Sequence, residues 1–377
     1  MKKKKVLFVA TVVKTHMMQF HLPYLKMFQD MGWETAVASR NDYEDPADCR
    51  IPYCDTYYDI PFERMPWKPK NLTAYRMLKK IIDQGEYDII HCHTPVGAMI
   101  ARLAALSARK KGTKVIYTAH GFHFFKGAPL INWLAFFPAE WLLAPITDVL
   151  VTINKEDYAR AQKLLHCKRI EYVPGVGIDV HKFRSEADPM EKRRELGFSA
   201  EDFLMLTVAE MTPNKNHITV LKAMALLKDR PEFANIHYLI CGRGEMWATL
   251  EQSAKDLGIS DHVHFLGYRT DAPALYHCSD QFVFVSFREG LSVALMEAMG
   301  SGMSIVCTQI RGNTDLIDHE VSGIFTENTP EALAQHILRL HGDSGLRSRL
   351  GQAAREKVQV FGEENVHRQM KQIYLSV

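Results

Sequence analysis

Two glutamates stand eight residues apart in the segment SFREGLSVALMEAMG (286–300), and a glycine directly follows the first of them. The apolar run at 282–286 predicts a short buried strand and residues 292–300 predict a helix, so Glu289 lies in the turn between them and Glu297 lies inside the helix. At about 1.5 Å of helical rise per residue, this spacing separates the carboxylates by on the order of 10 Å. One carboxylate could then bind the hydroxyl groups of a sugar while the other binds those of a ribose.

The turn after Glu289 opens onto a helix N-terminus. Backbone N–H groups at such a terminus lack intrahelical acceptors, and together with the helix dipole they favour a bound anion such as a diphosphate. The alternative is that two glutamates at this spacing are ordinary surface charge, but Glu297 stands in an apolar helix, where a carboxylate needs a partner or a ligand. The residues that carry the candidate N–H groups are Gly290, Leu291, Ser292 and Val293.

A loop lysine is the candidate cation for the same anion. Lys215 lies in the segment VAEMTPNKNH (208–217), after one predicted strand and before a helix at 218–227, with Asn214 beside it. An ammonium group is a compact charge that can meet a phosphate, and the alternative is a solvated loop lysine.

Two glycine-containing segments end other predicted strands of this half. The segment GRGE (242–245) lacks the third glycine of a dinucleotide-binding fingerprint and predicts a tight strand-to-helix turn. Gly267 and Tyr268 follow the next strand, where a glycine backbone and an aromatic ring could contact a nucleobase, with ordinary packing as the alternative.

Histidines follow strands in the first half of the chain. His120 lies in YTAHGFHF (117–124), directly after a predicted strand, so its imidazole could bond a sugar hydroxyl or accept a proton. His123 shares this segment, and His16 is a further candidate after the first strand. The alternative for these histidines is a packing or capping role.

The segment HCH (91–93) has the spacing of metal ligands, but alternation along a strand points Cys92 away from the two histidines, and no convergent carboxylate is evident. The chain also lacks an Asp-x-Asp pair for a divalent ion that bridges a nucleotide diphosphate. The sequence therefore predicts no metal site and no cofactor.

Length and composition limit the classes of protein to which the chain can belong. At 377 residues, 47% of them hydrophobic, the chain is long enough for two domains with their own cores. A formal charge of +2 gives no whole-protein case for nucleic-acid binding. The seven cysteines are odd in number and include no Cys-x-x-Cys pair, which argues against a disulfide framework or a zinc site and favours the cytoplasm.

Short strand patterns alternate with helical stretches, and this rhythm restarts after a Pro- and Gly-rich segment at 173–184 that turns charged through residue 194. The pattern predicts domains at 1–178 and 179–360, and a last helix at 361–377 that packs back on the N-terminal domain or on the other lobe. Because ligands bind beyond the carboxyl ends of parallel strands, both domains are expected to line one cleft. The predicted strands are 6–12, 35–38, 89–92, 114–118, 149–153, 170–173, 203–208, 237–241, 263–266, 281–285 and 304–308.

An aromatic stretch with one lysine, Lys126, raises the question of membrane contact. No uncharged apolar run reaches the roughly 20 residues needed to span a bilayer. A core helix is favoured because the stretch feeds the strand at 149, and peripheral contact with the inner face of the cell membrane, aided by the basic run at 2–5, is the alternative. The aromatic residues are Phe122, Phe124, Phe125, Trp133, Phe136, Phe137 and Trp141.

With the glutamate pair, Lys215, the segment VHFLGYR (263–269) and TAHG (118–121), the chain resembles a retaining glycosyltransferase of family 4, of the exopolysaccharide or capsule type. The resemblance covers nearly the whole chain. It implies the α/β GT-B fold, in which two Rossmann-like domains face each other across a cleft. The first domain would bind mainly an acceptor and the second mainly a nucleotide sugar.

The resemblance also implies roles for single residues. Glu289 would contact the hydroxyls of the donor sugar, Lys215 the diphosphate and Glu297 the ribose, while His120 would sit near the anomeric carbon. The leaving phosphate would help to deprotonate the acceptor hydroxyl on the same face, so that the α configuration is retained without a metal. The expected catalytic residues are His120, Lys215 and Glu289; the other donor-binding residues are Asn214, Gly267, Tyr268, Gly290, Leu291, Ser292, Val293 and Glu297; the acceptor-binding residues are Lys14, His16 and His123.

The sequence departs from the family pattern in two loops. Glu210 stands where the family often has an arginine a few residues before its lysine. The first loop reads VKTHM (13–17) where the family often has a glycine pair, and Lys14 and His16 are the candidates to replace what those glycines supply.

The expected activity is transfer of a hexosyl or N-acetylhexosaminyl group from a UDP-sugar to a lipid-linked or growing polysaccharide acceptor. UDP is preferred over GDP on family frequency alone. Two alternatives stay open: a UDP-sugar epimerase, because the GT-B architecture also serves that reaction, and a non-catalytic nucleotide-sugar-binding protein, suggested by Glu210.

Overall fold

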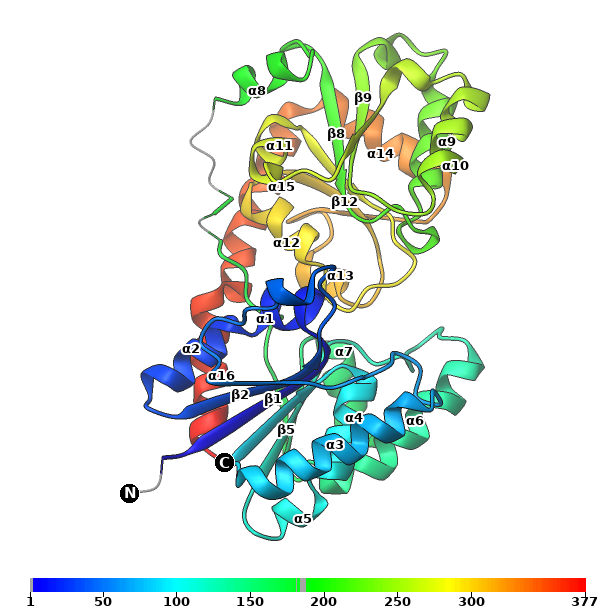
Figure 1. The fold of residues 1–377 in the computed structure, drawn as a ribbon. Helices are drawn as coiled ribbons and strands as arrows, with labels where there is room; N and C mark the ends of the chain where they lie inside the picture. Colours follow the sequence, from blue (N-terminus) through cyan, green and yellow to red (C-terminus); the bar gives the residue numbers. More distant parts are fainter. Residues whose placement is uncertain (1–2, 181, 184–187) are drawn as a thin grey trace. The chain divides into compact units, whose positions relative to one another are not determined.

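The computed structural model describes residues 3–180, 182–183 and 188–377, and the chain divides into two compact units. Unit 1 comprises Met1–Val176 and Val366–Val377, and unit 2 comprises Gly177–Asn365 (Figure 1). The division follows residue 176, two residues before the boundary drawn from the sequence. Within the basic run at 2–5 and the expected interdomain connection, residues 2, 181 and 184–187 lie outside the described residues.

Unit 1 is built on a seven-stranded parallel sheet in the order β3-β2-β1-β4-β5-β6-β7. The direction of winding reverses between β1 and β4, as in a doubly wound Rossmann-like sheet. The central strands are buried along almost their whole length, because helices cover both faces, and β4 carries two buried histidines, His91 and His93, among its apolar residues. The strands are β1 (Lys5–Val12), β2 (Glu34–Arg40), β3 (Thr56–Asp59), β4 (Ile89–His93), β5 (Lys114–Ala119), β6 (Val149–Thr152) and β7 (Ile170–Tyr172).

Alternate residues of β1 enter different cores. Leu7 and Val9 pack in a core with residues of α3 and α4, whereas Val6 and Phe8 pack in a core with residues of α2 and α16. A short π-helical turn, Val13–Met17, directly follows β1. The helices of unit 1 are α1 (Met18–Phe20), α2 (Leu22–Asp30), α3 (Lys70–Gly85), α4 (Pro95–Ala104), α5 (Leu106–Arg109), α6 (Leu130–Leu143), α7 (Lys155–Leu164) and α16 (Glu363–Leu375).

The last helix, α16, packs into unit 1 from the far end of the chain (Figure 1). Met370 and Tyr374 are buried there, and the Tyr374 ring lies 4.7 Å from the ring of Phe28 on α2. The Tyr374 hydroxyl also lies 2.7 Å from Nδ1 of His91 on β4. The end of the chain therefore covers one face of the unit 1 sheet.

Unit 2 repeats the same topology with six parallel strands in the order β10-β9-β8-β11-β12-β13, and its winding reverses between β8 and β11. One core gathers residues of α9, α10 and α14, and a second core on the other face gathers residues of α11, α12 and α15 (Figure 1). The strands are β8 (Phe203–Val208), β9 (Ile236–Cys241), β10 (Val263–Gly267), β11 (Gln281–Phe284), β12 (Ser304–Thr308) and β13 (Ile324–Thr326). The helices are α8 (Pro189–Glu195), α9 (His217–Leu227), α10 (Trp247–Leu257), α11 (Ala272–Cys278), α12 (Val293–Gly300), α13 (Asn313–Leu316), α14 (Pro330–Gly342) and α15 (Ser344–Lys357).

The predicted α/β class is confirmed, and two edge strands are added to the prediction. β3 and β13 are three or four residues long and lie at sheet edges, so neither offers the long apolar run by which a central parallel strand is recognised. Among the helices in the described part of the chain, none combines the length and apolar character needed to cross a bilayer.

Candidate functional site

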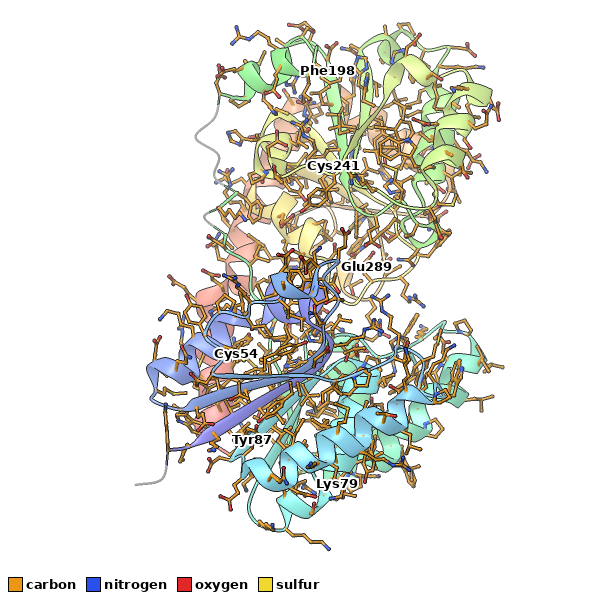
Figure 2. The ribbon with its side chains drawn as sticks, in the orientation of Figure 1. Cys54, Lys79, Tyr87, Phe198, Cys241 and Glu289 are labelled. Atoms are coloured by element: carbon orange, nitrogen blue, oxygen red, sulfur yellow. The ribbon has the colours of Figure 1, made fainter. Side chains whose placement is uncertain are left out.

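The loops after β8 and β11 meet at the switch point of the unit 2 sheet, where the two strands are neighbours. They bring together Lys215 and Glu289, whose Nζ and Oε1 atoms lie 2.7 Å apart. The two side chains are only 21% and 12% exposed. Figure 2 labels Glu289 in unit 2. In open α/β sheets, ligands bind outside the carboxyl ends of the strands at this point.

The Lys215 loop is tied to the Glu289 loop by its own asparagines. The backbone carbonyl of Asn214 accepts a hydrogen bond from the N–H of Phe287 at 2.9 Å, and its side-chain amide donates to the carbonyl of Arg288 at 2.9 Å. Asn216, which has a left-handed backbone with φ of 56°, donates to the carbonyl of Val285. Asn214, expected as a donor-binding residue, thus joins the two loops through both its backbone and its side chain.

A third loop supports the Glu289 turn from behind. Nε of Arg311 donates to the carbonyl of Glu289 at 3.1 Å. Gly312 has φ of 82°, and a Cβ atom there would lie 2.4 Å from the carbonyl oxygen of Gly290, so the close approach requires glycine. Arg311 was missed by the sequence analysis, although its place just after a predicted strand was a signal.

Helix α12 begins directly after this turn and presents its N-terminus. Ser292, predicted as the first helical residue, is the N-cap: its Oγ accepts a hydrogen bond from the N–H of Leu295 at 3.3 Å. Within the described residues, the backbone N–H groups of Gly290, Leu291 and Val293 donate no hydrogen bond. These groups and the Lys215 ammonium make the edge of unit 2 suited to an anion.

Glu297 lies within α12, and its carboxylate has the partner that its apolar surroundings require. Oε2 accepts a hydrogen bond from the hydroxyl of Tyr276 on α11 at 2.9 Å. Burial raises the pKa of the Glu297 carboxyl, while the hydrogen bond from Tyr276 and the charge of Lys182 act in the opposite direction. Sequence reasoning missed Tyr276, because nothing local connects it to Glu297.

The predicted tight turn at 242–245 is confirmed, and it packs on the loop that leads to Lys215. A Cβ atom on Gly242 would lie 1.9 Å from the carbonyl oxygen of Ala209, so only glycine fits there. The N–H of Met211 donates to the carbonyl of Arg243, and the N–H of Gly242 donates to the carbonyl of Gly267. Tyr268 is 70% exposed beside these loops, so its ring is accessible to a ligand and is not part of the core.

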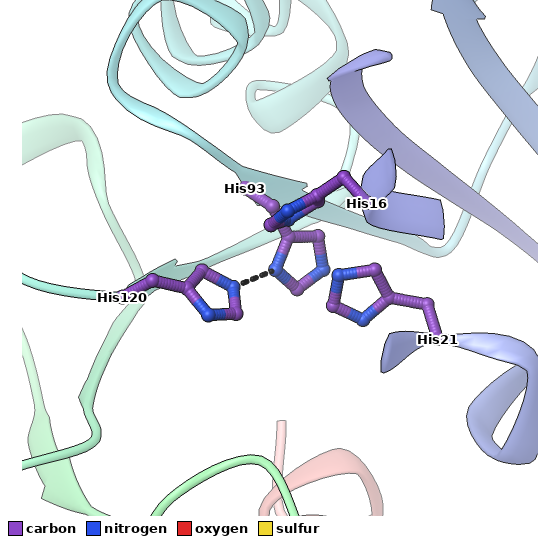
Figure 3. A group of neighbouring side chains, drawn as sticks. All are labelled: His16, His21, His93 and His120. Atoms are coloured by element: carbon purple, nitrogen blue, oxygen red, sulfur yellow. Dashed lines mark hydrogen bonds between the residues drawn. The ribbon is translucent and has the colours of Figure 1, made fainter. Parts of the chain in front are cut away.

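In unit 1, two of the predicted site histidines come together. His16 lies in the π-helical turn after β1 and His120 directly follows β5, and their ring centroids are 4.8 Å apart. His21 and His93 join them, and Figure 3 shows all four rings converging. Burial lowers the pKa of His16 to about 4, and burial followed by the neighbouring imidazoles lowers the pKa values of the other three well below their ordinary value.

The other two acceptor-side candidates lie apart from this group. Lys14 is exposed, its backbone N–H donates to Asp42, and its ammonium lies 5.4 Å from the ring centroid of Tyr43. His123 stacks on Phe136 of α6, with ring centroids 4.4 Å apart. The residues expected on the acceptor side therefore divide into at least two locations.

The prediction that Cys92 points away from the two histidines of the HCH segment is confirmed, and the two histidines have different contacts. The Cys92 thiol donates to the carbonyl of Ile116 and packs in the opposite core. His91 contacts Thr118 and Tyr374, whereas His93 joins the histidine group. Sequence reasoning missed His21 and His93 as members of this group, because its four histidines come from three separate parts of the chain.

The aromatic stretch belongs mainly to the core, as favoured from the sequence. Phe122 and Phe124 are buried, while Trp133, Phe136 and Phe137 pack against the same core. The side chains that α6 exposes are chiefly aliphatic: Leu130, Ile131, Leu134 and Leu142 are 80%, 67%, 74% and 65% exposed, with Trp141 at 48%.

Comparisons with known proteins agree with this architecture. Residues 188–357 match the family model described as "Glycosyl transferases group 1", and residues 5–154 match the model described as "Glycosyl transferase 4-like". The protein named "Putative glycosyltransferase EpsD" of Bacillus subtilis is 41% identical over 376 residues, which cover 98% of this chain and 96% of that protein.

A more distant relative is the UDP-Gal:alpha-D-GlcNAc-diphosphoundecaprenol alpha-1,3-galactosyltransferase of Escherichia coli, 27% identical over 288 residues, 74% of this chain and 72% of that protein. Among solved structures, that of Anabaena Alr3699/HepE in complex with UDP has a TM-score of 0.81 and 18% sequence identity. The alignment covers 100% of this chain and 100% of that chain. At that identity the likeness concerns the fold. The chain belongs to the family-4 glycosyltransferases, and its two Rossmann-like units are those of the GT-B fold.

Proposed function

We propose that this protein is a retaining glycosyltransferase that moves a hexosyl or N-acetylhexosaminyl group from a UDP-sugar to a lipid-linked or growing polysaccharide acceptor. The observation that carries the proposal is the 2.7 Å pair of Lys215 and Glu289 at the switch point of unit 2, directly before the α12 N-terminus. The name of the Escherichia coli relative, with its UDP-galactose donor and undecaprenol-linked acceptor, supports the donor and acceptor classes. HepE solved with UDP-glucose supports the same donor class.

The diphosphate would bind where the positive groups gather. The Lys215 ammonium has three N–H donors, so it can keep its contact with Glu289 and still donate to a phosphate oxygen. The N–H groups of Gly290 and Leu291 and the helix dipole would bind the same anion. These groups would stabilise the charge that develops on the leaving diphosphate, without a metal at this position.

The two carboxylates would then orient the donor from either side. Glu289 would accept hydrogen bonds from sugar hydroxyls and Glu297 from the ribose. The Tyr276 hydroxyl donates a hydrogen bond to one carboxylate oxygen of Glu297, and this bond fixes the orientation of the carboxylate. Tyr268 and the backbone of Gly267 would contact the base, which fits the exposure of that ring.

Glu210 stands where the family often has an arginine, so this position lacks a positive charge that would bind the diphosphate. Arg243 is exposed, and its carbonyl accepts a hydrogen bond from Met211, the residue next to Glu210. We therefore assign the missing guanidinium to Arg243. The reacting sugar would lie near His120, and the leaving phosphate would take the proton of the attacking hydroxyl on the same face.

Peripheral membrane contact is part of the proposal, through the exposed aliphatic side chains of α6. Leu130, Ile131 and Leu134 are each at least 67% exposed, and exposed Lys126 precedes them. An apolar patch beside a cation suits the interface of an anionic bilayer, where a lipid-linked acceptor is found. The occupant that we assign to this patch is the bilayer surface.

The test is to incubate the purified protein with UDP- and GDP-sugars, with and without membrane lipid extract, in EDTA, and to measure nucleoside diphosphate release. The proposal expects release from one UDP-sugar, raised by the extract and lost in Glu289→Ala, with an α-linked product by NMR. Conversion of a UDP-sugar to its epimer without acceptor would instead identify an epimerase. Binding of UDP-sugars without release or conversion would identify a non-catalytic binding protein.

A further inference from the structure

We propose that unit 1 contains a transition-metal site of the zinc class, in which His16, His21, His93 and His120 are the ligands. The four candidate ligand atoms, one from each imidazole, all lie within 4.8 Å of one another. The proposed function also uses His120, as a neighbour of the reacting sugar, but the observations that support the metal site all lie within unit 1, whereas the donor-binding residues belong to unit 2.

The topology of unit 1 concentrates these side chains at one sheet edge. His16 follows β1, His93 ends β4 and His120 follows β5, and these strands are neighbours in the sheet. His21 directly precedes α2. The group thus lies at the switch point of unit 1, between β1 and β4, where the carboxyl ends of the strands leave room for a ligand.

The spacing fits tetrahedral coordination. With zinc–nitrogen bonds of about 2.0–2.1 Å, two ligand nitrogens in a tetrahedron are about 3.3–3.4 Å apart. Nε2 of His120 and Nδ1 of His93 are 3.4 Å apart (Figure 3). For pairs at the 4.8 Å limit, a metal ion would need to draw the atoms closer by about 1.4 Å, a movement within the reach of side-chain rotations.

The imidazoles have buried nitrogen atoms that lack protein partners. Within the described residues, Nε2 of His16, Nε2 of His93 and both ring nitrogens of His21 make no hydrogen bond. His21 and His93 are only 2% and 1% exposed. Buried polar atoms normally have a hydrogen-bond partner, so these atoms point to a ligand. Because a metal ion takes one nitrogen from each ring, it would give a partner to Nε2 of His16 and to one nitrogen of His21.

The chemical type of the ligands indicates the class of metal. Neutral imidazole suits zinc, copper, nickel and iron, whereas calcium and magnesium prefer oxygen ligands.

A histidine group in unit 2 shows what packing alone looks like. His237 and His264 are joined by a 3.2 Å contact between Nδ1 and Nε2, and Nδ1 of His262 lies 2.9 Å from the carbonyl oxygen of Ile236. Nε2 of His120 and Nδ1 of His93 make a similar contact in unit 1, but among the described residues no ring nitrogen of the unit 2 group is buried without a partner, and that group lacks the metal-ligand geometry. The two groups therefore differ in the feature that distinguishes a ligand set.

Four protein ligands would complete a tetrahedral shell and leave no open position, so the site would be structural. It would join the ends of β1, β4 and β5 to the start of α2. Ligation uses one nitrogen of His120 and leaves the other available as an N–H donor.

The test uses the full chain without a polyhistidine tag, purified without metal-affinity resin, and measures bound metal by mass spectrometry. We expect about one zinc ion per chain in the wild type, and a loss of most of it in His21→Gln and His93→Gln. The control His264→Gln, which removes a histidine of the unit 2 group, should retain the metal.

Two further measurements keep the inference falsifiable if the His21 or His93 variants do not fold. Wild-type protein stripped with dipicolinate and refilled with Co²⁺ should show the intense visible bands of tetrahedral cobalt, and refilling with Zn²⁺ should raise the unfolding temperature. A wild type that contains no metal, gives no cobalt bands and shows no shift would overturn the site. UDP binding by calorimetry, which reports on unit 2, should be unchanged by the stripping.

Discussion

Lys215 and Glu289, 74 residues apart in the chain, form a 2.7 Å ion pair between Nζ and Oε1 where the loops after β8 and β11 meet. The pair is mostly shielded from solvent, so each side chain limits the other's conformations before a ligand arrives. A lysine already ordered beside an anion site loses less conformational entropy on binding.

Removing either member of this pair should abolish efficient donor use. For Lys215→Ala and Glu289→Ala we expect kcat/KM to fall by about 100-fold or more, because each removes an interaction at the reacting diphosphate or sugar. Steady-state release of nucleoside diphosphate measures this. Lys222→Ala, at an exposed position on α9, is the matched control. Wild-type kinetics in Glu289→Ala would refute the role assigned to that carboxylate.

The Tyr276 hydroxyl should affect the binding of UDP-sugar through the protonation state of Glu297. Burial raises the pKa of the Glu297 carboxyl and the Tyr276 hydrogen bond lowers it, so Tyr276→Phe should raise that pKa further. A protonated carboxyl accepts fewer hydrogen bonds from a ribose, so the variant should bind UDP-sugar about threefold to tenfold more weakly, with a larger loss at pH 6 than at pH 8.

Calorimetric titration with UDP-sugar at both pH values measures this effect. In the Glu297→Gln background the additional pH dependence should disappear, because no carboxyl remains at that position. An equal loss at both pH values in Tyr276→Phe would mean that the hydroxyl acts through packing and not through the carboxylate.

Gly312→Ala should destabilise the Glu289 turn. The added Cβ would lie 2.4 Å from the carbonyl oxygen of Gly290, on a backbone with φ of 82°. We expect a loss of about 1–3 kcal/mol in the free energy of unfolding of unit 2, together with weaker donor binding. Gly342→Ala is the control, because a Cβ there meets no atom within 4 Å. Denaturant titration measures the free energy of unfolding. Hydrogen exchange in peptides from unit 2 then distinguishes the unfolding of unit 2 from that of unit 1.

Lowering the pH should decrease the free energy of unfolding of unit 2, partly through His217. Burial, and to a smaller extent Lys215, lower the pKa of this histidine to about 4, while Nδ1 contacts the Tyr238 hydroxyl. The unfolded chain, with a histidine pKa near 6.5, binds more protons between about pH 6.5 and pH 4, so stability is complete above this range and falls as the pH decreases.

The slope from this single group is at most about 1.4 kcal/mol per pH unit. His217→Gln should therefore lose less stability than the wild type between pH 7 and pH 5, measured by thermal unfolding. His166→Gln, which removes an exposed histidine, is the control. Identical pH profiles for the wild type and His217→Gln would show that another group dominates the acid response.

The exposed face of α6 should mediate vesicle binding. Leu130→Ser with Leu134→Ser removes two side chains that are 80% and 74% exposed, and cosedimentation with phosphatidylglycerol-containing vesicles should fall about tenfold or more. Leu226→Ser, at a 53% exposed leucine of α9, should leave vesicle binding unchanged. Equal binding by all three proteins would remove α6 from the membrane interface.

Much of the architecture was predictable from local sequence. The central strands and the turn before Glu297 follow from apolar runs and their spacing, because burial along a strand or helix is periodic in consecutive residues. The edge strands β3 and β13 were not predictable in this way, since their short and partly exposed segments lack that pattern.

The sequence by itself determined which residues are available for chemistry: a glutamate pair around a helix start, a loop lysine and histidines after strands. Only the tertiary structure decided which of them meet. The ion pair of Lys215 with Glu289, the hydrogen bond of Tyr276 to Glu297 and the histidine group each join segments that are distant in the chain. The ion pair and the histidine group depend on strand order, because the carboxyl ends of neighbouring parallel strands meet at one edge however far apart they are in sequence. The Tyr276 hydrogen bond depends on the packing of α11 beside α12.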